Sequence, residues 1–354
     1  MAVKLTGKTG RTSFGFLAAS DKAPGNFDED DLNDRSVRPR IAEFAGKNAT
    51  FAVLRLKRDI GKENSLGVMA TYRGFPEQKN LVVSVDGRVK YSPKLTSLFQ
   101  VIGTHSRRCF FENEFEPSLN QDQAARNREI CGTGTYNIFG PQSQASLNGQ
   151  RSSFLNYRSG NGLAYFFNLD YSTKRHGMYF EAGGRSTEYL TDAGFTPRTN
   201  TNFAYLMNRF STDPKPKAAL IRVDARQFAS TNYDWKGRLQ TFNVGANASF
   251  AFQHSIFWFV ETGVARENIY ENEFGLVRKA TRPGAFVNGY SRGTWQQYIS
   301  TDLNQTVSKK FNFGVFLGTV NNAFDYDLGN YPQDPHPGRQ FDAEVYGEYK
   351  PIDP

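Results

Sequence analysis

Residues 239–264 carry the clearest alternation of hydrophobic and polar positions in the chain. Every second residue of the first half is apolar, and the alternation resumes after the polar break Gln253-His254-Ser255. A period of two is the mark of a β-strand, so the stretch predicts two long strands joined by a tight turn. We expect the apolar side to face lipid through Phe242, Val244, Phe250, Phe252, Ile256, Trp258 and Val260.

The length of these two strands indicates what the apolar side meets. Strands of soluble proteins average about 5 to 6 residues, whereas a strand that crosses a bilayer needs roughly 9 to 11. Both predicted strands have the longer length, and their other side carries Asn, Gly, Ser and Glu. A polar lumen accommodates such a side. The pattern favours a membrane β-barrel, and a soluble β-sandwich that binds a partner is the alternative.

The same alternation recurs along the whole chain and predicts about fifteen strands. Short turns follow strands of odd rank, starting with one at residues 7–10, while long polar segments such as 21–47 and 105–149 follow strands of even rank. Successive connections of an up-and-down barrel alternate between its ends, so all long loops share one rim. The predicted fold is an all-β, antiparallel up-and-down transmembrane β-barrel.

The strand count and the end of the sequence predict an incomplete barrel. Bacterial single-chain barrels have an even number of strands, and this chain stops just after a predicted strand at 341–349. We expect residues 1–354 to form one outer-membrane β-barrel domain without its last strands, leaving an exposed edge. The start, MAVKLTGKTG, has no apolar signal core, so either the secretion signal lies upstream or the protein is not exported.

The composition excludes some other classes of protein. No run of about 18 apolar residues could form a membrane helix. The net charge of +8 raises nucleic acid as a partner, but Lys and Arg are scattered and build no aromatic-basic motif. We therefore expect the lipid bilayer as partner, no nucleic acid, and the bacterial outer membrane as location, with the oligomeric state left open.

Charged residues on the polar sides of the predicted strands are candidates for lining the lumen. They could form a conduction path or ligand tunnel, since lumen residues set selectivity. Alternatively, they could neutralise one another and plug the lumen. The candidates are Arg55, Lys57, Arg73, Asp86, Arg88, Asp170, Glu181, Arg185, Arg222, Asp224, Arg226 and Glu261.

Two further candidates lie in the predicted long loops. Cys109 and Cys131 share one loop, and in an exported chain they predict a disulfide, with two free thiols as the alternative. Asp28 and Asp30 belong to an acidic run that offers oxygen ligands for calcium, but the run lacks the glycine and final glutamate of a calcium loop. We therefore predict no metal site and no cofactor.

Catalytic motifs are not visible in the chain, so the sequence leaves enzymatic activity undecided. No Gly-x-Ser-x-Gly or phosphate-binding loop is present, and the four histidines lie in or beside predicted turns or loops. Glycan hydrolysis would need carboxylates such as Glu112, Glu114 and Glu116. The main prediction is a pore, transporter or membrane anchor.

Four short stretches together resemble one family of bacterial outer-membrane barrels. They are residues 4–11 (KLTGKTGR), 54–60 (LRLKRDI), 85–88 (VDGR) and 192–198 (DAGFTPR). The family is the domain of unknown function that follows a carbohydrate-binding family-nine-like domain in large secreted proteins. The resemblance implies a barrel preceded by a soluble glycan-binding-like domain, and hence glycans or small solutes as ligands.

Overall fold

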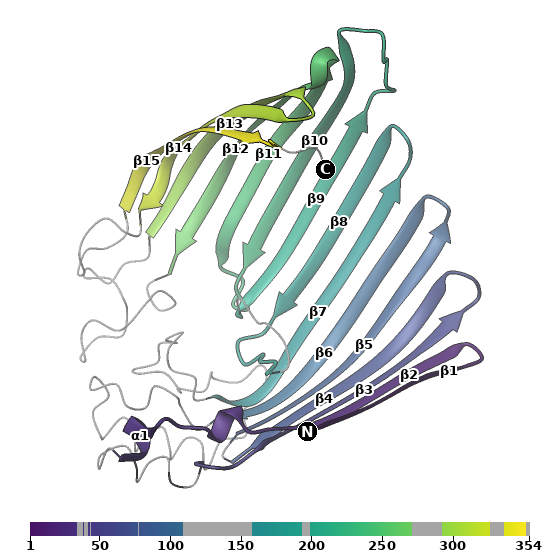
Figure 1. Ribbon diagram of the computed structural model, residues 1–354, viewed down its shortest axis with the longest axis vertical. Helices are drawn as coiled ribbons and strands as arrows, with labels where there is room; N and C mark the ends of the chain where they lie inside the picture. Colours follow the sequence, from purple (N-terminus) through teal and green to yellow (C-terminus); the bar gives the residue numbers. More distant parts are fainter. Residues whose placement is uncertain are drawn as a thin grey trace.

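The computed structural model describes residues 1–33, 38, 42, 44–76, 78–108, 158–192, 199–270, 292–325 and 336–351. Within this part of the chain, fifteen strands form one sheet in which each strand pairs antiparallel with its neighbours in sequence (Figure 1). The predicted order and direction of the strands are confirmed. Their bounds are β1 (Ala2–Thr9), β2 (Thr12–Asp21), β3 (Ala49–Ile60), β4 (Asn64–Phe75), β5 (Gln78–Ser92), β6 (Leu95–Arg108), β7 (Arg158–Ser172), β8 (His176–Arg185), β9 (Thr201–Ser211), β10 (Leu220–Tyr233), β11 (Leu239–Phe252), β12 (Ile256–Ile269), β13 (Arg292–Ser308), β14 (Phe311–Asp325) and β15 (His336–Tyr349).

Paired residues share a face of the sheet, so the sheet has one largely apolar face and one face that carries most of the charged and polar side chains. An apolar row crosses six strands through Val223, Phe250, Trp258, Leu303, Val315 and Val345. One residue further along, a row crosses the same strands through Asp224, Ser249, Phe259, Asp302, Phe316 and Glu344. A slip of one residue in any strand would exchange its two faces, so fifteen strands in matching register keep the faces separate.

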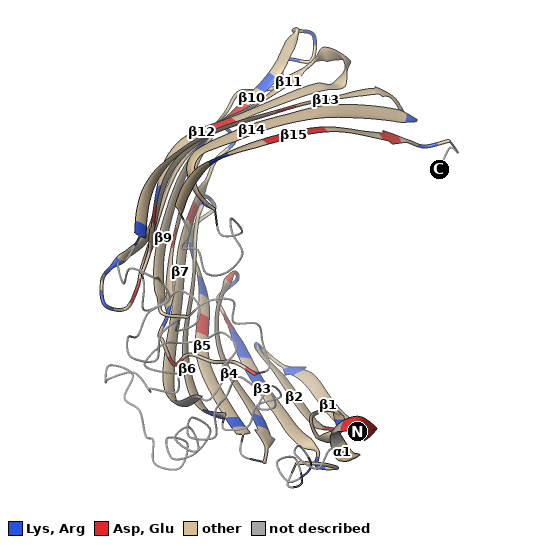
Figure 2. Cartoon of the chain, turned by 90° about the vertical axis from the view of Figure 1, so that its left-hand side faces the viewer, with Lys and Arg blue, Asp and Glu red and all other residues tan. Residues whose placement is uncertain are grey.

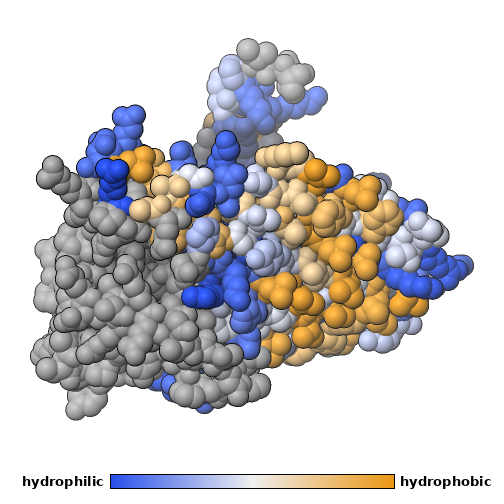
Figure 3. Space-filling model, turned by 90° about the horizontal axis from the view of Figure 1, so that it is seen from below, coloured by the Kyte–Doolittle hydropathy of each residue, from blue (hydrophilic) through white to orange (hydrophobic). Residues whose placement is uncertain are grey.

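The polar face is the concave side of a strongly curved sheet (Figure 2). Side chains from strands two apart meet on this face: Tyr346 on β15 donates a hydrogen bond to Asp302 on β13, with an oxygen–oxygen distance of 2.9 Å. Residues of this face are also the more buried ones: along β5, Gln78, Asn80 and Ser84 are buried, while Lys79, Leu81 and Val83 between them are exposed. The convex face is covered by apolar side chains, with hydrophilic residues at the end that carries the tight turns (Figure 3).

The large exposed hydrophobic side chains belong almost entirely to the convex face. Examples are Val83 at 46%, Val101 at 49% and Ile299 at 52% exposure. Leu98 and Phe257 are exceptions that lie on the concave face near the tight turns. The buried hydrophobic cluster of Phe44, Ala49 and Phe75 is small. Packing between two layers therefore does not hold this sheet together, and strand pairing does.

The sheet is open in the described part of the chain. β1 and β15 each pair with a single neighbour, so no closure of the sheet into a barrel is seen in the described residues, and both edges are open. Between β2 and β3 the described residues include a 3-10 helix at Ala23–Gly25 and the short helix α1 at Glu29–Asn33.

The tight turns that follow strands of odd rank all lie at one end of the sheet, as predicted. The bounds of two of these turns differ from the prediction. The expected turn at residues 7–10 is wrong: Gly7, Lys8 and Thr9 belong to β1, and only Gly10 and Arg11 turn. Gly10 has φ +57°, a conformation that glycine adopts at no steric cost. The sequence pattern predicts a strand over 290–302, and the observed β13 runs six residues further to Ser308, through a bulge between Thr306 and Ser308.

No helix in the described residues combines the length and the apolar character needed to traverse a membrane.

Candidate functional site: the concave polar face

All twelve charged residues proposed from the sequence for the lumen lie on the concave face. The registers place Arg55, Lys57, Arg73, Asp86, Arg88, Asp170, Glu181, Arg185, Arg222, Asp224, Arg226 and Glu261 there. They are spread from β3 to β12 and do not form one cluster. The seven residues expected to face lipid lie on the convex face: Phe242, Val244, Phe250, Phe252, Ile256, Trp258 and Val260.

Arg55 on β3 and Asp86 on β5 form an ion pair across the strand between them. Arg55 Nη2 donates to Asp86 Oδ2 at 2.7 Å, and Nη1 donates to the other carboxylate oxygen. Gly67 on β4 makes this possible, because a Cβ there would lie 2.6 Å from Arg55 Nη2. The pair shows that opposite charges on this face neutralise each other locally.

Other acidic groups on the concave face are also hydrogen-bonded. Asp224 Oδ1 accepts from Arg222 Nη2 at 2.7 Å and from Ser211 Oγ at 2.5 Å. Glu261 Oε2 accepts from Asn247 Nδ2 at 3.1 Å, and Glu181 accepts from the Tyr179 hydroxyl. Buried or half-buried carboxylates are stabilised by such donors. These contacts support the neutralising alternative at several points along the sheet.

The two flanks of the concave face differ in the sign of their charged side chains (Figure 2). In the described residues, β1–β5 place seven basic and three acidic side chains there, whereas β12–β15 place one basic and six acidic side chains. The basic flank has Lys4, Lys8, Arg55, Lys57, Arg73, Arg88 and Lys90 with Asp21, Asp59 and Asp86; the acidic flank has Glu261, Glu267, Asp302, Asp342, Glu344 and Glu348 with Arg292. The two flanks therefore carry opposite net charge.

Residues 186–192, which we name the inner segment, pack on the concave face at the end that carries the long loops. The segment leaves β8 beside β7, where Ser186 N donates to Leu163 O at 2.8 Å. Its backbone then lies against Gly162 on β7, since a Cβ on that glycine would be 2.7 Å from Tyr189 N. Tyr189 is 5% exposed, and burial raises the pKa of its hydroxyl.

Asn80 on β5 binds the backbone of the last three residues of the inner segment. Its Nδ2 donates to Leu190 O at 2.9 Å and to Ser106 Oγ on β6 at 2.8 Å, while its Oδ1 accepts from Asp192 N at 3.1 Å. Asn80 and Ser106 are each 1% exposed. A fully satisfied buried amide of this kind defines a single position for the backbone that it binds.

Arg73 on β4 holds the far end of the inner segment. Its Nη1 lies 3.2 Å from Asp192 Oδ2 and donates to Gln78 Oε1 at 2.9 Å, and its guanidinium lies over the Phe51 ring. The two charged side chains are 15% and 8% exposed. The inner segment thus crosses β7, β6 and β5 and ends on β4, where it narrows the concave space.

The β10–β11 connection supports the start of the inner segment from the other side. Trp235 Nε1 donates to Arg185 O at 2.7 Å. The connection is held by Asp234, whose side chain is fully buried and pairs with Arg238 Nε at 2.6 Å. Burial acts to raise the pKa of Asp234, but donors from Arg238 and the Lys236 N–H hold it below its usual range.

The metal and disulfide candidates gain no further support. Within the described residues, no three His, Cys, Asp or Glu side chains gather at one place. Asp28 precedes α1, where its carbonyl accepts from Leu32 N at 3.1 Å, and Asp30 lies inside α1. Cys109, Cys131 and the carboxylates Glu112, Glu114 and Glu116 fall outside the described residues.

Comparisons with known proteins find similarity in structure alone. No protein-family model matches the chain, and no curated protein matches its sequence. A bacterial polysaccharide outer membrane secretin is 10% identical with a TM-score of 0.31, over 96% of this chain and 84% of that one. BamA from Haemophilus ducreyi is also 10% identical, with a TM-score of 0.37, over 98% of this chain and 69% of that one.

Proposed function

We propose that this sheet is the wall of an outer-membrane β-barrel, with its convex face in lipid and its concave face lining a polar passage. The observation that carries the proposal is the register of the fifteen strands. It places the alternate apolar residues of each strand on the convex face and most charged and polar residues on the concave face. A barrel has no free edges, so the β1 and β15 edges must be paired in the membrane.

The extent of the apolar face supports a lipid environment. Soluble monomers rarely expose an apolar patch larger than about 300–600 Å². Here large hydrophobic side chains between 36% and 80% exposed lie on the convex face from β1 to β15. Such a face requires another apolar phase. The bilayer suits it because each described strand pairs along its length with its neighbours in the sheet, so that the ladder satisfies the backbone polar groups between strands except at a few bulges.

The best-supported role for the concave face is a pore whose mouth is narrowed at the long-loop end. The inner segment supports the narrowing, and the opposite charges of the two flanks support passage of polar or zwitterionic solutes. Local neutralisation, as at Arg55 and Asp86, favours a second role, a filled barrel that anchors another domain. We place the protein in the bacterial outer membrane with the long loops outside.

Conductance in a planar bilayer tests the pore. We expect the full-length protein to give discrete channels, and Arg73→Gln or Asp192→Asn to enlarge them by releasing the inner segment. Arg222→Gln is the matched control, since it also breaks one ion pair of the concave face, but far from the inner segment. If the wild-type protein and all three variants insert into the bilayer but none of them conducts, the pore role is wrong and the anchor role is favoured instead.

A further inference from the structure

A row of aromatic and small residues, which we name the aromatic strip, crosses the concave face from β8 to β13. Its members are direct cross-strand partners, so they lie side by side across the sheet. They are Tyr179, Met207, Phe228, Gly245, Gly263 and Tyr298. All of them belong to described strands, and the four larger side chains are half-buried. Part of each of these side chains therefore faces the concave space.

Two rings of the aromatic strip meet over a glycine. A Cβ on Gly245 would lie 2.6 Å from Phe228 Cζ and 2.5 Å from Tyr298 Oη. The two side chains thus reach the same point from opposite sides, Phe228 from β10 and Tyr298 from β13. The tyrosine ring also passes over Gly263, where a Cβ would lie 2.5 Å from Tyr298 Cζ. A ring that lies along the backbone in this way turns its other face to the concave space.

The β8 end of the aromatic strip is widened by a second tyrosine. Tyr205 on β9 lies one row closer to the long loops, and its ring centroid is 6.2 Å from that of Tyr179. Asn168 Nδ2 donates to the Tyr179 hydroxyl at 3.4 Å, and this hydroxyl donates to Glu181. Met207 lies between Tyr179 and Phe228, where its thioether suits contact with rings. Hydrogen bonds therefore hold the Tyr179 ring in place within the apolar strip.

Hydrogen-bonding side chains border the aromatic strip on both sides. The bordering rows carry two arginines and two glutamates, so their charges cancel. The row on the tight-turn side contains Arg209, Arg226, Asn247, Glu261 and Ser300, and the row on the long-loop side contains Glu181, Tyr205, Ser230, Asn243 and Gln296. Apolar rings between neutral amides and hydroxyls suit an uncharged ligand that has both apolar and hydroxyl-bearing surfaces.

The aromatic strip runs obliquely along the proposed passage. Tyr179 lies near the tight-turn end of β8, which begins at His176, whereas Tyr298 lies in the middle of β13. The strands of a barrel are tilted against its axis, so a row of direct partners winds along the axis as it crosses the strands. A chain-like ligand that moves along the passage would meet the rings one after another.

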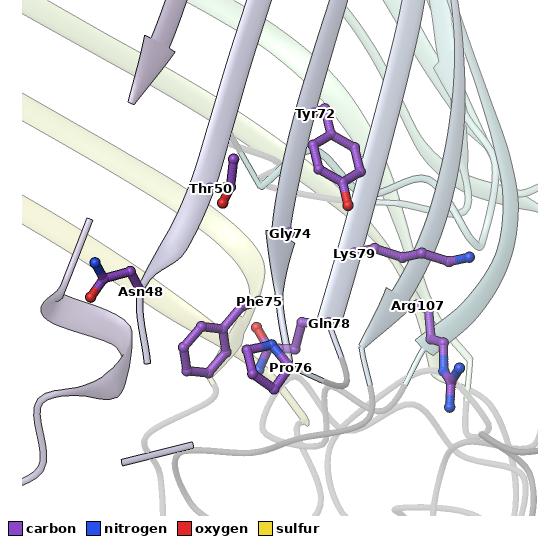
Figure 4. A pocket seen from close by; sticks show the side chains of 9 residues that line it. All are labelled: Asn48, Thr50, Tyr72, Gly74, Phe75, Pro76, Gln78, Lys79 and Arg107. Carbon is purple, nitrogen blue, oxygen red and sulfur yellow. The ribbon is translucent and has the colours of Figure 1, made fainter. Parts of the chain in front are cut away.

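The open recess at the long-loop end of β3–β6 shows no comparable arrangement. It has a volume of about 490 Å³, but the polar ends of Thr50, Lys79 and Arg107 point apart (Figure 4). The recess therefore offers no point at which these groups meet one ligand, whereas the members of the aromatic strip form a continuous row.

We propose that the aromatic strip binds neutral oligosaccharides, whose pyranose rings stack on the aromatic rings of the wall. A pyranose has C–H groups on a face of its ring and hydroxyl groups around its edge. It therefore meets the rings of the strip and the amides and hydroxyls of the bordering rows at the same time. The inference rests on the proposed passage and deepens it by naming the class of solute. The cancelled charge beside the strip favours uncharged sugars over anionic or cationic ones.

Saturation-transfer NMR on the full chain in lipid nanodiscs tests the aromatic strip. The probes are maltohexaose, cellohexaose and xylohexaose, with polyethylene glycol of similar length as a flexible chain without sugar rings. We expect transfer to the C–H protons of at least one hexaose and none to polyethylene glycol. Phe228→Leu keeps an apolar side chain but removes the ring, so it should weaken binding about fivefold, whereas Phe228→Tyr should bind like the wild type.

Phe257→Leu is the matched control. Phe257 lies on the concave face of β12 near the tight turns, outside the aromatic strip, so its replacement should leave binding unchanged. Equal weakening by Phe257→Leu and Phe228→Leu, or equal transfer to polyethylene glycol, would overturn the inference. Absence of transfer to all three hexaoses would also overturn it, and conductance of the same protein in a planar bilayer would show that the pore nevertheless stands. Binding to a protein that inserts but does not conduct would support the aromatic strip and contradict the pore.

Discussion

The Tyr298 hydroxyl on β13 donates a hydrogen bond to Asn243 Oδ1 on β11, with an oxygen–oxygen distance of 3.0 Å. The bond passes over the intervening strand at Gly263, the direct partner of Tyr298. Gly263 in turn pairs with Gly245 on β11. Two glycines side by side give the aromatic ring a flat place to lie on the concave face, and the tyrosine joins strands that are not neighbours.

We predict that Gly263→Ala destabilises the sheet. The new Cβ would lie 2.5 Å from Tyr298 Cζ and 2.6 Å from the Val244 carbonyl oxygen. The backbone carbonyl cannot move away easily, so the expected cost is about 1–3 kcal/mol, as for other overpacked sites. Urea unfolding of the refolded protein in lipid measures it.

Gly15→Ala is the control for this experiment. Gly15 lies on the concave face of β2, and a Cβ there would meet only Thr6 Cγ2 at 3.8 Å. The control should be neutral or slightly stabilising. Equal stability of the two variants would show that the ring does not lie over Gly263.

Strand number and face assignment were predictable from sequence because both depend on a local period of two. Residues 239–264 specify two strands and their faces without any distant contact, and the prediction for Phe242 and Trp258 follows from that. The turn at Gly10 was misplaced because four residues of glycine-rich sequence fit more than one turn. In the structure Gly7 pairs with Phe14 within the β1–β2 ladder, and the Phe14 ring lies where a Cβ on residue 7 would be, at 2.5 Å.

Asp213 connects two tight turns through its hydrogen bonds. We therefore predict that the free energy of unfolding depends on pH in the acid range. Hydrogen bonds from Arg175 and then Lys174 lower the pKa of Asp213 to about 2. A carboxyl group whose pKa is lowered on folding contributes stability above its unfolded pKa and loses it as the pH falls through the folded value. The contribution should be complete above about pH 5 and fade as the pH falls through about 4 towards 2.

Comparison of the wild-type protein with Asp213→Asn isolates this effect. We expect the difference in unfolding midpoint between the two proteins to be constant between about pH 5 and 7, because this range lies above the unfolded pKa of the carboxyl group. The difference should shrink as the pH falls below about 5. A difference that is the same at all pH values would mean that the carboxylate does not act through its charge.

Val260 and Asn247 provide a comparison between the two faces. Val260 lies on the convex face and Asn247 on the concave face beside Glu261. In a lipid-facing strand Val260→Arg should cost roughly 2–4 kcal/mol near the bilayer midplane, whereas the same charge on the lumen side is tolerated. Asn247→Arg should therefore be nearly neutral, because Glu261 can pair with it. Equal costs in lipid-inserted protein would contradict the assignment of the faces.

The inner segment could not have been predicted from the pattern of the sequence. Its residues follow no period of two, and its position depends on Asn80 and Arg73, which lie more than one hundred residues earlier in the chain. Ion pairing on the concave face was foreseen only as an alternative. The choice of partners, such as Arg55 with Asp86, depends on the absence of a side chain at Gly67.

Quenching of the three native tryptophans by lipids brominated at known depth tests most directly whether the convex face meets lipid. Trp258 and Trp295 lie on the convex face at 39% and 53% exposure, whereas Trp235 is bonded to Arg185 O in the β10–β11 connection. In variants that keep one tryptophan at a time, we predict strong quenching of Trp258 and Trp295 and little quenching of Trp235. Quenching of Trp235 alone, or of none in a protein that has inserted, would contradict the account.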